Sequence, residues 1–128
     1  MSKKPTSGEL EILDVLWERG ASTVREVYEI LSGRARPTGY TTVLKLMQIM
    51  LEKGLVERDS SAKAHVYRAL ASRDETQKNL VSDLLEKAFR GSALKLVQHV
   101  LETKPASAAE LAEIRRLIAD AEKKGESE

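Results

Sequence analysis

The sequence predicts a mainly α-helical protein with one small β-hairpin, because helix-start signals and apolar stripes at helical spacing recur along it. Each start signal is a capping box, a Ser or Thr followed three residues later by Glu, whose side chains satisfy free backbone amides at a helix end. The capping boxes are Thr6/Glu9, Thr23/Glu26, Ser72/Glu75 and Ser107/Glu110. The stretch after Gly54 departs from the helical pattern. We expect two domains, residues 1–71 with the hairpin and residues 72–128 with helices alone.

Two short helices open the first domain. The first begins at its capping residue Thr6 and ends at Gly20, and its apolar stripe contains Leu10, Leu13, Leu16 and Trp17. The second begins at Thr23 and ends at Gly33, and its apolar stripe contains Val24, Val27, Tyr28 and Leu31. Each is therefore a short helix with one buried stripe.

A third helix and the hairpin complete the first domain. The helix begins at Tyr40 and ends at Gly54, and its apolar stripe contains Val43, Leu46, Met47 and Met50. Residues 55–58 and 64–69 are extended in character, and the segment between them is turn-like. Helix, turn and helix followed by a hairpin are the elements of a winged helix, in which the hairpin gains stability by packing against the helices.

The second domain is expected to consist of three short helices, separated near Gly91 and Pro105. Three short helices are too few to enclose a core alone, so their apolar stripes need a partner. A second copy of the chain is the simplest partner, which predicts a homodimer. The expected interface residues are Leu84, Phe89, Leu94, Val97, Leu101, Leu111, Ile114 and Ile118. The polar tail from Glu122 to Glu128 is expected to fray.

Composition excludes several classes of protein. The chain has no cysteine, which excludes disulfides, thiolate zinc sites and cysteine nucleophiles, and fits a reducing cytoplasm. Its two histidines, His65 and His99, fall in different domains, and no glycine-rich phosphate loop is present, so we expect no enzyme activity, metal site or cofactor. No run of eighteen apolar residues occurs, so we expect neither export nor membrane insertion.

Positive charge is concentrated in one segment, although the whole chain has a net charge of only +1. Between residues 33 and 68, seven basic residues stand against three acidic ones, and the remainder of the chain is net negative. An excess of this size also fits an ordinary solvated surface. The residues expected to contact DNA phosphates are Arg34, Arg36, Tyr40, Arg58, Lys63 and Arg68.

The helix that begins at Tyr40 has an outer face suited to reading bases in a DNA groove. When its apolar stripe faces inward, the 100° step per residue leaves four polar residues on or beside the outer face, near the helix start. These expected base contacts are Thr41, Thr42, Lys45 and Gln48. Lysine can reach guanine acceptors, glutamine can pair with adenine, and threonine can contact a base or a thymine methyl group. The other interpretation is that the two threonines merely cap the helix.

Several short strings in the first domain match a known family in their order and spacing. The strings are Glu9-Leu10-Glu11-Ile12, Val15-Leu16-Trp17, Thr23-Val24-Arg25-Glu26-Val27, Tyr40-Thr41-Thr42-Val43, Glu52-Lys53-Gly54-Leu55-Val56 and Val66-Tyr67. They resemble the penicillinase repressor family, which contains the BlaI and MecI repressors and the copper-responsive CopY repressors. The resemblance implies a winged-helix repressor that binds a double-stranded, dyad-symmetric operator as a homodimer held by its C-terminal helices. For the β-lactam systems it also implies relief of repression by a membrane-bound sensor protease.

Two departures limit what the resemblance implies. CopY-type members end in a cysteine metal-binding motif, and this chain has no cysteine. The β-lactam repressors are cut at an Asn-Phe bond in the dimerisation region, and the corresponding position here is His99-Val100. The alternative function is a winged-helix module that serves protein–protein assembly without binding DNA.

Overall fold

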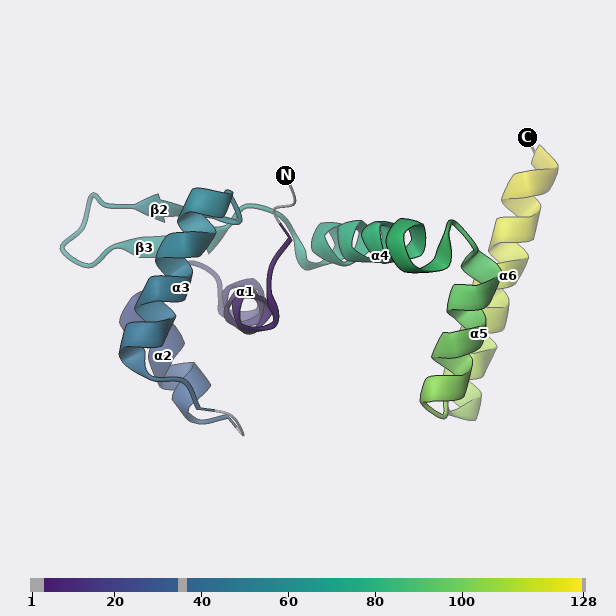
Figure 1. Ribbon diagram of the computed structural model, residues 1–128, viewed down its shortest axis with the longest axis horizontal. Helices are drawn as coiled ribbons and strands as arrows, with labels where there is room; N and C mark the ends of the chain where they lie inside the picture. The colour runs from purple at the N-terminus through teal and green to yellow at the C-terminus, as the bar shows by residue number, and fades with distance from the viewer. Residues whose placement is uncertain (1–3, 35–36, 128) are drawn as a thin grey trace. The chain divides into compact units, whose positions relative to one another are not determined.

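The computed structural model describes residues 4–34 and 37–127. Its elements, in chain order, are α1 (Ser7–Arg19), β1 (Ser22–Thr23), α2 (Val24–Ser32), α3 (Tyr40–Lys53), β2 (Val56–Asp59), β3 (Val66–Ala69), α4 (Arg73–Phe89), α5 (Ala93–Thr103) and α6 (Ala108–Ser127) (Figure 1). Three helices followed by a hairpin and then by helices confirm the predicted fold class. The chain divides into two compact units within α4, after Ser82, whereas the sequence analysis placed the boundary after residue 71.

The starts of α1 and α2 are built by the predicted capping boxes. At α1, Thr6 Oγ1 accepts from the Glu9 amide at 3.3 Å, and the Thr6 amide donates to Glu9 Oε1 at 2.9 Å. At α2, the reciprocal bonds between Thr23 and Glu26 are 3.1 and 2.8 Å long. These bonds fix both helix starts because they satisfy amides that lack partners within the helix. The third helix ends as expected at Gly54, whose φ of 79° is left-handed and suits glycine.

The core of the first unit lies between α1, α2, α3 and the sheet. Its buried side chains are Ile12, Leu13, Val15, Leu16, Val24, Val27, Leu31, Val43, Met47, Met50, Val56 and Tyr67. The predicted stripe of α1 was partly wrong, since Ile12 and Val15 are buried while Leu10 and Trp17 are only half-buried. The reason is that α1 contacts α2, α3 and β3, so a wider arc of its surface is covered than one stripe provides.

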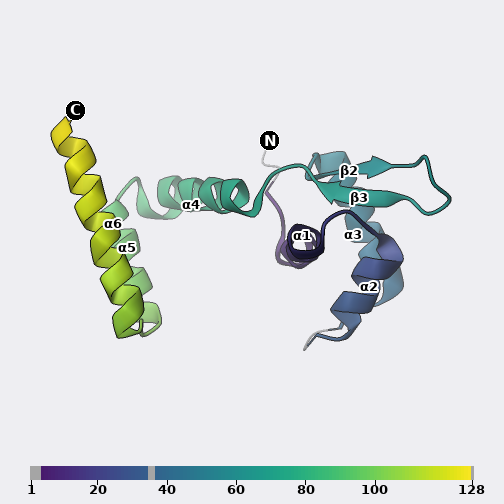
Figure 2. The same cartoon turned by 180° about the vertical axis from the view of Figure 1, so that it is seen from behind.

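The hairpin belongs to a three-stranded antiparallel sheet in the order β1-β3-β2. Strand β3 is central, and its Tyr67 pairs with Ser22 on one side and Arg58 on the other. Tyr67 is 2% exposed and so fixes the hairpin to the core. We call β2, β3 and their connecting loop the wing; the loop projects past the helices when the chain is seen from either side (Figures 1 and 2).

A buried carboxylate connects the start of α1 to the end of α3. Glu9 is 1% exposed, and its Oε1 lies 2.7 Å from Nζ of Lys53, the last residue of α3. The same oxygen accepts the Thr6 amide, so the capping box and the ion pair share one group. A charge removed from water in this way is tolerated because it has both a cation and a backbone donor.

The capping box of α2 gives the stability of the first unit a dependence on pH. The pKa of Glu26 is lowered, first because the Thr23 backbone amide donates to its carboxylate, with the nearby Arg19 lowering it further. The folded state therefore favours the ionised form, and this stabilisation is complete at neutral pH and lost as the pH falls through the lowered pKa. We expect Glu26→Gln to destabilise the protein at neutral pH and the difference from the parent to shrink in acid.

Urea denaturation of both proteins across acid and neutral pH measures this effect. Glu29→Gln is the matched control, because Glu29 is exposed on the same helix and its side chain makes no capping bond among the described residues. A difference between Glu26→Gln and its parent that stayed constant with pH would contradict the prediction.

The second unit has no fully buried side chain among residues 83–126. The apolar residues of α5 and α6 are half-buried or exposed, and Leu94 is 76% exposed. Helix α6 runs on to Ser127, so the expectation that the chain frays from Glu122 is wrong. Arg116 contributes to this helix by pairing with Glu113 at 2.8 Å and Asp120 at 3.3 Å, three and four residues away.

Candidate nucleic-acid interface

Helix α3 presents a polar face outside the core. Val43, Met47 and Met50 anchor its other side, which places all four expected base-contacting residues on exposed positions: Thr41, Thr42, Lys45 and Gln48. The residue that caps the helix is Gly39, and no side chain bonds to the cap. The interpretation of Thr41 and Thr42 as capping residues is therefore wrong.

The side chains on this face have no partners within the described part of the chain. None of the hydrogen bonds or ion pairs among residues 4–34 and 37–127 involves the side chains of Thr41, Thr42, Lys45 or Gln48. Their donors and acceptors are thus open to a ligand. Other charged side chains of the first unit do have ionic partners, among them Arg19, Glu57 and Arg73.

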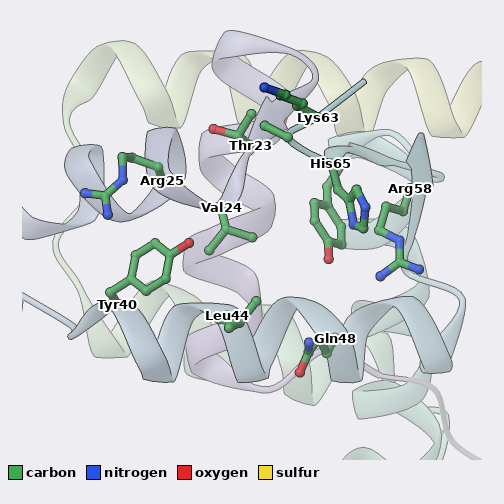
Figure 3. A pocket seen from close by; sticks show the side chains of 11 residues that line it. Thr23, Val24, Arg25, Tyr40, Leu44, Gln48, Arg58, Lys63 and His65 are labelled. Carbon is green, nitrogen blue, oxygen red and sulfur yellow. The ribbon is translucent and has the colours of Figure 1, made fainter. Parts of the chain in front are cut away.

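A basic hollow adjoins this face, between α3, the start of α2 and the wing (Figure 3). Its volume is about 510 Å³, and its lining residues are Thr23, Val24, Arg25, Tyr40, Leu44, Gln48, Arg58, Lys63, Ala64, His65 and Tyr67. Arg25 and Tyr40 lie on one side, Arg58 and His65 lie on the other, and Gln48 belongs to both the hollow and the outer face of α3. No described residue that lines the hollow is a carboxylate, so its charge is positive.

Arg25 is the member of the hollow that the sequence analysis missed. Its guanidinium lies 5.0 Å from the ring centroid of Tyr40, and the Tyr40 ring meets Tyr28 edge-on at 5.6 Å. Stacking on an aromatic face restrains an exposed arginine while leaving its outer N–H groups free to donate. Its place in the first turn of the helix that precedes α3 is the signal that could have identified it. His65 was noted on the wing but was not assigned to this surface.

The predicted phosphate contacts fall into two groups. Tyr40, Arg58 and Lys63 line the hollow, whereas Arg34 pairs with Asp14 at 3.5 Å and Arg68 pairs with Glu57. The alternation of side chains along a strand explains why Arg68 does not line the hollow. Arg68 stands opposite Glu57 and Arg58 stands opposite Tyr67, and these neighbouring pairs face opposite sides of the sheet. Arg36 lies outside the described residues.

The same described residues contain no group of three or more His, Asp or Glu side chains placed to hold a metal ion. None of their helices combines the length and the apolar character needed to span a bilayer. His65 and His99 lie in different units.

Comparison with known proteins gives a family that covers both units. The family model described as penicillinase repressor matches residues 5–120. The chain is 36% identical over 126 residues to the transcriptional regulator BlaI of Mycobacterium tuberculosis, covering 95% of this chain and 89% of the relative. It is 20% identical over 113 residues to the methicillin resistance regulatory protein MecI of Mammaliicoccus sciuri, covering 88% and 91% of the two chains. The resemblance noted in the sequence is thereby confirmed, and the chain belongs to the penicillinase repressor family.

Proposed function

We propose that this protein is a transcriptional repressor that binds a dyad-symmetric operator as a homodimer in the cytoplasm. The observation that carries the proposal is the exposed face of α3, whose polar side chains have no partner among the described residues. This face adjoins a hollow that is lined by basic side chains and by no acidic ones. A buried or internally paired face could not insert into a groove. The protein acts by binding and not by catalysis.

In this proposal α3 enters the major groove and reads bases. Lys45 donates to guanine acceptors, Gln48 pairs with adenine, and Thr41 and Thr42 contact bases or thymine methyl groups near the start of the helix. An α-helix fits the major groove, where each base pair presents a distinct pattern of donors and acceptors. These contacts give sequence specificity.

The basic hollow receives the DNA backbone. Arg25, Arg58 and Lys63 surround it with positive charge, and the Tyr40 hydroxyl adds a neutral donor at the start of α3. Backbone contacts of this kind orient a protein on the duplex and supply affinity, but they carry no sequence information. Arg34 and Arg68 contribute less, because each already has a carboxylate partner.

The second unit joins two copies of the chain. Its helices present apolar residues at spacings of three and four: Leu94, Val97 and Leu101 on α5, and Leu111, Ile114 and Ile118 on α6. Leu84 and Phe89 of α4 extend this surface. Burying such a stripe against its copy supplies the core that the second unit lacks by itself.

Induction by a membrane-bound sensor protease is the form of regulation that fits the family resemblance. The position that corresponds to the cut, His99-Val100, lies in the middle of α5, and both side chains are exposed. His99 also approaches the Phe89 ring, with centroids 5.9 Å apart. A cut within α5 would remove part of the dimer stripe, and proteolysis there requires local opening of the helix.

Base readout is tested by two substitutions on α3. We expect Lys45→Ala and Thr42→Ala each to weaken binding to the cognate operator by about 1–3 kcal/mol per lost base contact, with a much smaller loss on random DNA. Fluorescence anisotropy with both duplexes, starting from the promoter of the protein's own gene, measures the effect.

Lys63→Ala is the control, because a lost phosphate contact should weaken all sequences alike. An equal loss on operator and random DNA for Lys45→Ala would contradict base reading by α3. Parent protein that bound neither duplex would instead favour the assembly module.

A further inference from the structure

Where the chain leaves the winged helix, polar contacts within the first unit hold the start of α4 and the residues just before it to α1. The Trp17 indole Nε1 donates to the Ala71 carbonyl at 2.9 Å. An Arg73 guanidinium nitrogen donates to Asp14 Oδ1 at 2.7 Å and lies 3.9 Å from Glu18 Oε1, a longer ion pair. The same guanidinium lies 5.5 Å from the Trp17 ring centroid. We call Asp14, Trp17 and Arg73 the latch. Asp14 also lies 3.5 Å from Arg34, so its carboxylate is shared by two cations.

Apolar packing contributes little at the same place. Of the residues of α4, all of which the structure describes, Thr76 alone is buried. A hollow of about 430 Å³ lies beside the latch and is lined by Leu10, Glu11, Asp14, Trp17, Arg34, Arg73, Thr76, Gln77 and Leu80. A helix with an incomplete apolar contact can pivot, since close packing is what normally fixes the crossing of two helices. The direction of the first turns of α4 therefore depends on the latch.

The direction of α4 matters for a dimer that reads two half-sites. Each reading helix must reach its own half-site, and the spacing between half-sites is a geometric property of the dimer. Once one winged helix of the dimer has bound, the other binds its half-site at an effective concentration. This concentration depends on how well α4 holds the second winged helix in place. A loosely held α4 lowers this effective concentration at the best half-site spacing. It also lets the dimer bind operators with other half-site spacings more readily.

We propose that Asp14, Trp17 and Arg73 are positioning residues that set the operator spacing accepted by the dimer. The inference rests on the proposed function, because it requires a dimer with two winged helices that bind DNA. None of the three residues is on the DNA-reading face of α3 or in the basic hollow. Their effect on DNA is thus exerted through the direction of α4.

The chemistry of the latch makes arginine specific at position 73. One exposed ion pair is a weak constraint, but here a planar cation both stacks on an indole and bonds to a carboxylate that a second arginine holds. Lysine would keep the charge without the stacking and the fork of donors. Arg73→Lys should therefore keep only part of the operator affinity at the cognate spacing that Arg73→Ala loses.

The first experiment measures binding to operators whose half-site spacing is shortened or lengthened by one or two base pairs. We expect Arg73→Ala and Asp14→Asn to weaken binding at the cognate spacing by about tenfold, to leave single half-site affinity unchanged, and to flatten the spacing profile. Lys78→Ala is the matched control, because it removes the same charge from an exposed pair within α4 that does not touch α1. An unchanged spacing profile in Arg73→Ala, or a half-site loss as large as the full-operator loss, would overturn the proposal.

A second experiment needs no DNA. Since the chain has no cysteine, Glu29→Cys provides one spin-label site per subunit on the exposed face of α2. The distance distribution between the two labels of a dimer should broaden in the Arg73→Ala background and stay narrow in the Lys78→Ala background. Equal widths in both backgrounds would overturn the latch, whereas broadening in a protein that bound no operator would support the latch and count against the proposed function alone.

Discussion

Leu101→Asp should convert the proposed dimer into monomers. Leu101 is 42% exposed on α5, in line with Leu94 and Val97, and no residue between 83 and 126 is buried in the single chain. In a dimer this position would lie in an apolar seam, where a carboxylate without a cation would lose its hydration and gain no partner. Sedimentation at micromolar concentration should then give the mass of one chain.

The same substitution should weaken operator binding by about 100-fold or more, because a monomer loses the avidity of two linked half-sites. Affinity for a single half-site should not change, since Leu101 is far along the chain from α3 and the wing. Lys95→Asp is a stringent control: it introduces the same carboxylate into α5 with a larger change of charge, about 100° around the helix from Leu94. A Leu101→Asp protein that stayed dimeric would place the interface elsewhere.

The fold could be predicted largely because its signals are local. The capping boxes at Thr6 and Thr23 and the left-handed Gly54 fix three helix ends within a few residues of sequence. Strand β1 was not predicted, because Ser22 and Thr23 are too few for an alternating pattern and form a strand only where β3 passes beside them. The burial of Ile12 and Val15 likewise depends on how many elements surround α1.

The candidate site also has a part that follows from local sequence signals and a part that depends on contacts between distant elements. The outer face of α3 follows from its period, so Thr41, Lys45 and their neighbours could be placed from the sequence alone. The basic hollow depends on tertiary contacts. Arg25 belongs to it by stacking on Tyr40, which lies fifteen residues further along the chain, after a loop. The ion pairs that occupy Arg34 and Arg68 are also properties of the folded chain.

Operator affinity should fall steeply with salt. If the dimer contacts about six to ten phosphates, binding should weaken by about 10³–10⁵ between roughly 50 and 200 mM salt, because each contact releases condensed counterions. Arg25→Ala, Arg58→Ala and Lys63→Ala each remove one contact per subunit. Each should therefore make the slope of log affinity against log salt shallower by about 1.8 for a dimer.

Arg68→Ala is the matched control for these three variants, because Arg68 also lies on the wing but pairs with Glu57 on the opposite face of the sheet. Its salt slope should stay close to that of the parent. Slopes that were unchanged in Arg25→Ala, Arg58→Ala and Lys63→Ala would remove the basic hollow from the DNA interface. A protein that served only protein–protein assembly would show no operator binding whose salt dependence could be measured, so the titration separates the two functions that the sequence left open.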